Sequence, residues 1–359
     1  MANADRIMVG TRKGLFELRR NEGWRVTTRH FLGEPVSMVM VDPRDDTVYA
    51  ALNLGHFGAK LWRRESGASE WSACGVPVYP PQPEGEHGKS LQLIWSLEAG
   101  GPEEPGVLWA GTIPGGLFRS NDKGESWALN VPLWARPERA EWFGGGYDQP
   151  GIHSICVDPR DSRHLSIAVS CGGVWQTHDG GNEWAPTCQG MYADYMPPER
   201  REDPVVQDPH RMVQCPSDPD TLWVQHHCGI YRSIDGGARW MRVFAQPSSF
   251  GFAVAVHPHL PDTTWFVPSV KDECRVPVDD RFVVTRTDDS GASFATLSNG
   301  LPEGHAYDLV YRHGLDVDET GECLAMGSTT GALWLTEDGG LHWRCLSAHL
   351  PPIYAVRFG

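Results

Sequence analysis

Residues 177–184 read Thr-His-Asp-Gly-Gly-Asn-Glu-Trp. The pattern Ser/Thr-x-Asp-x-Gly-x-x-aromatic returns at 120–127, 233–240, 287–294 and 336–343. In such a segment the Asp side chain can accept backbone N–H groups, and Gly supplies the positive φ that closes a tight turn. The aromatic residue then begins a strand and packs on the neighbouring sheet. The repeat therefore predicts a recurring β-hairpin, the Asp box, with structural aspartates at Asp122, Asp179, Asp235, Asp289 and Asp338.

The repeat also sets the architecture. Weaker copies lead to Trp24 and Trp71, so seven units follow one another at intervals of roughly 50 residues, the period of propeller blades. Each unit reads as four short strands separated by Gly and Pro turns. The chain begins with second and third strands, and residues 353–359 resemble an unaccompanied inner strand, so we expect the C-terminal strand to close the ring.

The sequence thus predicts an all-β, seven-bladed β-propeller of four-stranded antiparallel blades in a single domain, 1–359. The expected blades are residues 5–30 with 353–359, then 36–74, 90–130, 153–187, 211–244, 251–297 and 306–346.

Composition restricts the partners. The 46 acidic residues exceed the 31 Lys and Arg, for a net charge of −15, and this balance argues against nucleic acid. No apolar run approaches the roughly 20 residues of a membrane helix, which argues against a membrane. The N-terminus lacks a signal-peptide pattern, and nine scattered cysteines fit a reducing compartment, so a cytoplasmic location is expected. The oligomeric state stays open.

Long loops point to the site. In a four-stranded meander, the second connection and the inter-blade connection lie on the same rim. The predicted long loops on that rim span 73–89, 131–152, 187–212 and 267–281. Because loops of this length in compact domains are commonly functional, we expect them to wall one side of the pore mouth and to carry the site.

The candidate residues on this rim fall into four chemical groups. Carboxylates suited to general acid–base work are the catalytic candidates Asp148, Asp272 and Glu273, whereas Asp308 is assigned to ligand binding. Arg211 and Arg275 could grip substrate carboxylates, and Tyr147 and Tyr307 could stack on sugar rings. His153, His210 and His305 lie at or just before expected inner strands, and His226 and His227 lie in a second connection.

The histidines allow two interpretations. Imidazoles that converge on a channel could bind a transition metal in the pore, or they could hydrogen-bond loop backbone around it. No recognised metal-ligand spacing is present. We therefore expect them to contribute to ligand binding and expect no metal and no other cofactor.

The chain resembles the Asp-box, or bacterial neuraminidase repeat (BNR), propellers. This group includes sialidases, sortilin-type receptors, family-74 glycoside hydrolases and a photosystem II assembly factor. The resemblance is nearest to bacterial seven-bladed proteins described as glycosyl hydrolases, through GGYDQPGIHSICVDPRD (145–161), QDPHRMVQCP (207–216), SSFGFAVAVHP (248–258) and HLPPIYAVRFG (349–359). It implies a sialidase-like fold and carbohydrate hydrolysis. Sialidases carry Phe/Tyr-Arg-Ile-Pro, whereas residues 5–8 read Asp-Arg-Ile-Met, so an authentic sialidase is not expected.

Two classes of function remain open. The first is a glycosyl hydrolase-like propeller that binds a small polar or carbohydrate-like ligand at the pore mouth. The second is a non-catalytic scaffold that presents the same rim to a protein partner. A narrow pocket with two close carboxylates or a histidine cluster would favour the first, and a broad, shallow surface would favour the second.

Overall fold

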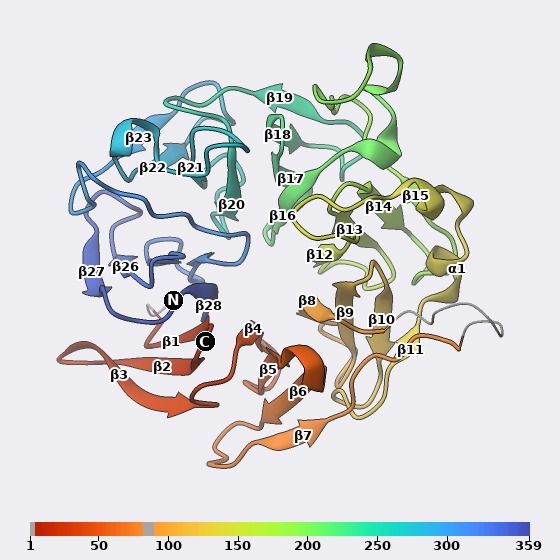
Figure 1. Ribbon diagram of the computed structural model, residues 1–359, viewed down its shortest axis with the longest axis horizontal. Coiled ribbons are helices and arrows are strands. Elements are labelled where there is room, and N and C mark those ends of the chain that lie inside the picture. The colour runs from red at the N-terminus through yellow and green to blue at the C-terminus, as the bar shows by residue number, and fades with distance from the viewer. Residues whose placement is uncertain (1–3, 82–89) are drawn as a thin grey trace.

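Seven sheets surround a central axis in the computed structural model, which describes residues 4–81 and 90–359 (Figure 1). Each sheet has four antiparallel strands, and the strand order follows the sequence except where the first blade is completed. The seven-bladed all-β propeller predicted from the repeat is therefore confirmed. Of the long loop expected at 73–89, residues 82–89 lie outside the described residues.

The blades are given from the axis outward. The first four consist of β28 (Ile353–Phe358), β1 (Arg6–Thr11), β2 (Gly14–Asn21) and β3 (Gly23–His30); β4 (Val36–Val41), β5 (Val48–Asn53), β6 (Ala59–Arg64) and β7 (Ser72–Cys74); β8 (Leu93–Ala99), β9 (Leu108–Ile113), β10 (Leu117–Ser120) and β11 (Ala128–Leu129); and β12 (Ile152–Val157), β13 (Leu165–Val169), β14 (Gly173–Thr177) and β15 (Ala185–Pro186).

The remaining three blades have the same plan. They consist of β16 (Pro209–Cys215), β17 (Asp218–His226), β18 (Gly229–Ser233) and β19 (Met241–Val243); β20 (Gly251–Val256), β21 (Thr264–Pro268), β22 (Val284–Thr287) and β23 (Ala295–Leu297); and β24 (Leu315–Val317), β25 (Leu324–Gly327), β26 (Leu333–Thr336) and β27 (Arg344–Ser347). Short helices interrupt the connections at α1 (Val131–Trp134), η1 (Gly55–Phe57), η2 (Pro137–Glu141), η3 (Pro198–Arg200), η4 (Pro204–Val206) and η5 (Val278–Asp280).

The two ends of the chain close the ring together. β28 pairs antiparallel with β1, with Val356 opposite Val9 and Ala355 opposite Gly10. Both Val356 and Val9 are fully buried. Figure 1 shows the N- and C-termini beside each other at the first blade. As predicted, the C-terminal strand supplies the inner strand of the first blade, and β1 has no free edge.

The repeated hairpins share one hydrogen-bond pattern. At 177–184, Asp179 Oδ1 accepts the backbone N–H of Glu183 at 2.9 Å, and Thr177 Oγ1 accepts that of Gly181 at 2.9 Å. Gly181 has a φ of +94°, which a residue with a Cβ adopts only under strain. The indole N–H of Trp184 donates to Asn130 Oδ1 of the preceding blade at 3.0 Å. This hairpin therefore closes its own blade and also ties it to the previous one.

The hydrophobic core lies between neighbouring blades. Between the sixth and seventh blades, Trp265 and Phe282 pack with Trp334, and the rings of Phe282 and Trp334 lie 4.9 Å apart. Trp175 and Trp223 are fully buried in equivalent layers. Burial of one such side chain contributes about 2–3 kcal/mol. Tryptophan is therefore abundant because it fills the contacts between neighbouring blades. These contacts fix the blades, and with them the loops near the axis.

The seventh blade differs from the expectation. Its inner strand begins at Leu315, although the predicted blade began at residue 306. The segment before β24 is a loop that is tied down by side chains: Asp308 accepts hydrogen bonds from Ser328 Oγ, at 2.7 Å, and from Thr330 Oγ1. The placement of His305 just before an inner strand was therefore wrong, because these polar contacts hold its segment outside the sheet.

The described part of the chain contains no helix with the length and apolar character needed to traverse a bilayer.

Candidate functional site

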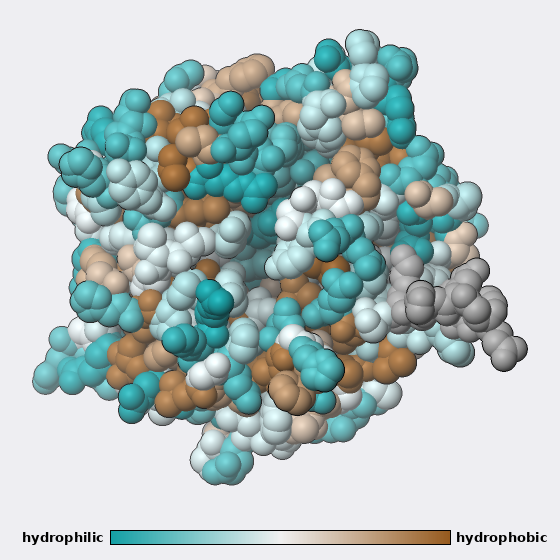
Figure 2. All heavy atoms as spheres, in the orientation of Figure 1, coloured by the Kyte–Doolittle hydropathy of each residue, from teal (hydrophilic) through white to brown (hydrophobic). Residues whose placement is uncertain are grey.

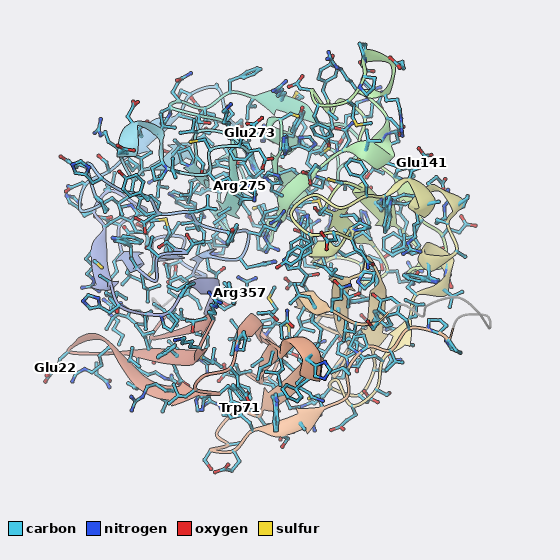
Figure 3. All side chains as sticks on the ribbon, viewed as in Figure 1. Glu22, Trp71, Glu141, Glu273, Arg275 and Arg357 are labelled. Carbon is cyan, nitrogen blue, oxygen red and sulfur yellow. The ribbon has the colours of Figure 1, made fainter. Side chains whose placement is uncertain are left out.

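A cavity of about 690 Å³ opens at the axis, on the rim formed by the second connections and the inter-blade loops. The molecular surface is hollowed at this position in Figure 2. Figure 3 shows Arg275 and Arg357 near the axis, whereas Glu22 and Glu141 lie at the periphery. Three of the four long loops predicted for this rim, 131–152, 187–212 and 267–281, contribute lining residues.

Six of the predicted site residues line this cavity. They are Tyr147, His210, His227, Asp272, Glu273 and Arg275. They come from different blades, and closure of the ring brings them together. The lining also includes residues that we did not select from the sequence, namely Trp95, Asp208, Phe252, Tyr311, Arg312, His313 and Tyr354.

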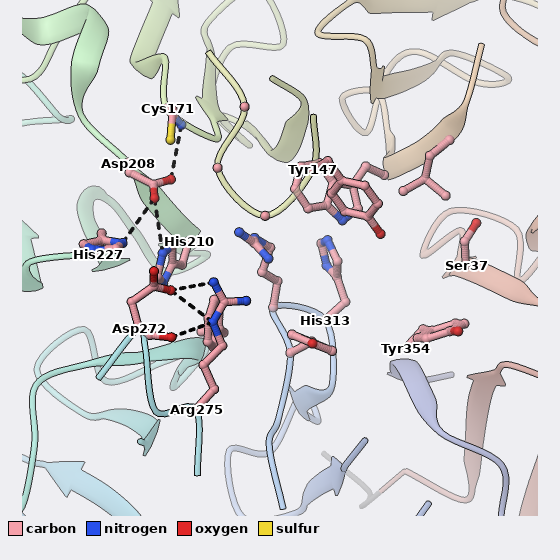
Figure 4. A pocket seen from close by; sticks show the side chains of 18 of the residues that line it. Ser37, Tyr147, Cys171, Asp208, His210, His227, Asp272, Arg275, His313 and Tyr354 are labelled. Atoms are coloured by element: carbon pink, nitrogen blue, oxygen red, sulfur yellow. Dashed lines mark hydrogen bonds and ion pairs between the residues drawn. The ribbon is translucent and has the colours of Figure 1, made fainter. Parts of the chain in front are cut away.

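Asp208 is the centre of a polar cluster. Its Oδ1 accepts the backbone N–H of Cys171 at 3.2 Å. Its Oδ2 lies 3.4 Å from Nε2 of His210 and 3.4 Å from Nδ1 of His227 (Figure 4). Burial by itself would raise the pKa of Asp208, but the two imidazoles and Arg312 outweigh that effect and hold the pKa well below its usual range. Asp208 is therefore a buried carboxylate that stays ionised.

The His210 ring is fixed on several sides. Its Nδ1 lies 2.7 Å from the carbonyl oxygen of Gly251, which can only accept, so Nδ1 carries a hydrogen. The ring stacks on Phe252 at a centroid distance of 4.4 Å. Burial lowers the pKa of His210 despite the opposing charge of Asp208. The hydrogen on Nδ1 and the stacked ring leave Nε2 facing Asp208.

His227 lies at the open side of the cluster, with a quarter of its side chain exposed. Partial burial opposes its positive form, but the carboxylates of Asp208 and Asp272 outweigh burial and raise the pKa of His227. Asp272 is itself held by Arg275, whose Nη2 and Nε donate to Oδ1 at 2.5 and 3.0 Å. This side of the cavity thus carries charges of both signs.

Arg312 is buried at 7% exposure. Its guanidinium lies over the ring of Trp95, 4.7 Å from the centroid, and 5.4 Å from that of Phe252. Within the described ranges, no carboxylate lies at ion-pair distance from Arg312, and its Nε has no hydrogen-bond partner. Burial lowers the pKa of Arg312, and the charge of Asp208 partly offsets this. The cavity wall therefore presents an unpaired cation.

The other predicted site residues lie outside the cavity lining. Asp148, His305 and Tyr307 are exposed, and Asp308 is held by Ser328. His153 is buried and bonds to the carbonyl of Pro209 at 2.7 Å, which ties two inner strands together. None of these five side chains reaches the cavity wall.

His226 and Arg211 are not part of the cavity lining. His226 is buried, and its Nε2 accepts the backbone N–H of Asp208 at 3.0 Å, so it positions the chain that carries that carboxylate. Arg211 lines a second, smaller cavity, and burial lowers its pKa together with the charge of Arg357, whereas Glu98 and Asp316 oppose that shift. Burial also disfavours the charged form of Glu98 and so raises its pKa.

One signal could have identified Asp208. It stands two residues before His210, and residues at i and i+2 of an extended segment share a face. His210 was selected because it lies at an inner strand, so the same reasoning extends to Asp208. Arg312 offered no such signal, because its segment was assigned to a strand that the structure does not form there.

No protein-family model matches the sequence. The chain is similar to xyloglucanases. Xyloglucanase Xgh74A of Acetivibrio thermocellus is 31% identical over 150 residues, which cover 37% of this chain and 16% of the relative. The oligoxyloglucan-reducing end-specific xyloglucanase of Emericella nidulans is 25% identical over 232 residues, which cover 62% of this chain and 24% of the relative. The matched region is thus a quarter or less of these relatives' own length.

Solved structures share the fold. The GH74 xyloglucanase of Xanthomonas campestris superposes with a TM-score of 0.65 at 18% identity, covering 99% of this chain and 52% of that chain. A structure described as YCF48 bound to D1 peptide superposes with a TM-score of 0.56 at 15% identity, covering 91% and 88%. At these identities the likeness concerns the fold.

Proposed function

We propose that this chain is a glycosyl hydrolase-like propeller that binds a small acidic, carbohydrate-like ligand in the pore-mouth cavity. The observation that carries the proposal is the unpaired Arg312 guanidinium in the cavity wall. A buried charge without a counter-ion is costly, and a ligand carboxylate would relieve that cost with charge-assisted hydrogen bonds.

The remaining walls suit a sugar. A cavity of about 690 Å³ falls in the range of small-molecule sites. The ring centroids of Trp95 and Tyr147 lie 5.1 Å apart, edge to face, and Tyr147 lines the cavity with 48% of its surface exposed. Aromatic faces of this kind pack on sugar rings. The xyloglucanases similar to this chain are carbohydrate-active, which supports the same ligand class.

A standard pair of glycosidase carboxylates receives less support. Such a pair needs one carboxyl group with a raised pKa to act as the acid. Among the described carboxylates that line the cavity, Asp208 and Glu273 have lowered pKa values, and Asp272 is bonded to Arg275. We therefore assign Asp272 and Arg275 to ligand orientation. The contacts proposed here bind the ligand, and none of them is assigned a catalytic step.

The alternative is a protein-binding scaffold, the role suggested by the YCF48 peptide complex. A scaffold would favour a broad and shallow rim. The concave cavity with its cluster of Asp208, His210 and His227 supports the small-ligand proposal instead.

Calorimetric titration with glucuronate and glucose tests the proposal, because the two sugars differ in one carboxylate. We expect the acid to bind at least about tenfold more tightly, and crystals soaked with it to show density beside Arg312. Equal affinity for both sugars, or density confined to another surface, would contradict the proposal. Binding of a peptide at the rim with no sugar binding would favour the scaffold.

A further inference from the structure

His210 and Asp208 face each other in this cluster. Nδ1 of His210 carries a hydrogen, which it donates to the carbonyl of Gly251. The other ring nitrogen, Nε2, faces Oδ2 of Asp208 at 3.4 Å. A carboxylate oxygen can only accept, so the contact between Nε2 and Oδ2 is attractive only with a cation between them, either a proton on Nε2 or a metal ion.

The spacing around Asp208 matches a metal site. Zinc binds imidazole nitrogen and carboxylate oxygen at about 2.0–2.2 Å, which separates two ligands of a tetrahedral site by about 3.3–3.6 Å. Nε2 of His210 and Nδ1 of His227 both lie 3.4 Å from Oδ2 of Asp208. The ligand atoms of all three residues fall within 4.8 Å of one another.

Outer contacts hold these ligand atoms in place. A metal-binding histidine typically donates its other ring N–H to a carbonyl or carboxylate, as His210 does to Gly251. Phe252 stacks on the same ring and prevents it from turning. The N–H of Cys171 occupies Oδ1 of Asp208 and leaves Oδ2 for the site. The arrangement is therefore organised before any ion arrives.

We propose that Asp208, His210 and His227 bind a divalent transition-metal ion, with zinc as the best match, through Oδ2, Nε2 and Nδ1. Two imidazoles and one carboxylate are a ligand set that zinc accepts, and three protein ligands leave a fourth position for water or a ligand oxygen. His227 is partly exposed and lines the cavity (Figure 4), so we expect the fourth position to face the cavity. This inference goes beyond the proposed sugar binding and does not depend on it.

The test uses the full chain, purified without a metal-affinity tag, stripped with EDTA and titrated with zinc chloride in a calorimeter. We expect one ion per chain. Asp208→Asn and His227→Ala should each bind zinc at least roughly 100-fold more weakly. Glu22→Gln, at the outer edge, and His349→Ala, on an exposed loop, are the matched controls and should bind zinc as the wild type does.

Thermal unfolding of the metal-free forms shows whether each variant is folded, and zinc should raise Tm only where the three ligands are intact. Cobalt loading adds a second readout, because coordination by this ligand set should give visible absorption that Asp208→Asn abolishes. The proposal is overturned if the folded wild type binds no stoichiometric zinc, or if the variants bind zinc as tightly as the wild type does. The cation between Nε2 of His210 and Oδ2 of Asp208 would then be a proton on Nε2. Glucuronate titration of the metal-free protein separates this result from failure of the sugar proposal.

Discussion

Replacement of Arg312 by Met should change ligand binding and stability in opposite directions. Met keeps an unbranched apolar stem over Trp95 and Phe252 but removes the guanidinium. In the ligand-free protein, that guanidinium is buried without a carboxylate at ion-pair distance in the described part of the chain. The charge is therefore present at a cost to folding, and we expect the ligand to offset that cost.

The magnitudes follow from these contacts. A charge-assisted hydrogen bond contributes about 1.5–3 kcal/mol, so the variant should bind glucuronate about 10- to 150-fold more weakly. Removing a buried unpaired charge raises the free energy of unfolding by about 1–3 kcal/mol. Losing the cation–π contacts with Trp95 and Phe252 lowers it by about 0.5–2 kcal/mol. The net gain in unfolding free energy is about 1 kcal/mol, or about 1–2 °C in Tm for a chain of this size.

Calorimetry with glucuronate and glucose measures the first effect, and thermal unfolding without ligand measures the second. Arg25→Met, on the exposed strand β3, is the matched control and should change neither. Glucose affinity should stay within about threefold of wild type, because it lacks the carboxylate. A variant that loses stability and keeps its affinity for glucuronate would refute the reasoning, since Arg312 would then be a structural residue.

Three other perturbations test the scaffold. Asp179→Ala removes the acceptor for the N–H groups of Asn182 and Glu183 and should lower the unfolding free energy by about 1–2 kcal/mol in a urea titration. Deletion of 353–359 removes the partner of β1 and should give aggregates in size-exclusion chromatography. Burial would raise the pKa of Glu17, but Arg64 and Arg19 lower it below its unfolded value of about 4.3. Its stabilisation is therefore present above that pH and fades as the pH falls through the folded-state pKa, so the stability deficit of Glu17→Gln should shrink from pH 7 to pH 3.

Each of these has a contrary outcome. An unchanged urea midpoint for Asp179→Ala would show that its hydrogen bonds contribute nothing net. A truncated chain that elutes as a stable monomer would mean that β28 does not protect β1. A deficit for Glu17→Gln that is constant with pH would show that its ionisation is not coupled to folding.

Much of the fold was predictable from local chemistry. The hairpin of Asp179, Gly181 and Trp184 is specified within eight consecutive residues, because its hydrogen bonds and its positive φ involve near neighbours. The closing strand was predictable as well, because it was a strand without a blade and the first blade lacked an inner strand. The inner strand of the seventh blade was misplaced because side chains far along the chain, such as Ser328, hold Asp308 in a loop.

The candidate site was predictable only in part. The long loops identified the rim, and Tyr147, His210 and Arg275 were among the residues they carry to the cavity. Asp208 and Arg312 were missed because their significance depends on distance between blades, which sequence spacing does not express.

The sequence by itself therefore determined the seven-bladed ring and the rim that carries long loops, because turns and strands arise from contacts between near neighbours. Closure by residues 353–359 was predictable for a different reason, because the repeat left one strand without a blade and one blade without its inner strand. The tertiary structure decided which polar side chains meet. His210 and His227 converge on Asp208 at 3.4 Å, and Arg312 is left unpaired between Trp95 and Phe252. Those distances exist only once the blades pack around a common axis, because the burial of aromatic side chains between blades fixes where each inner strand ends.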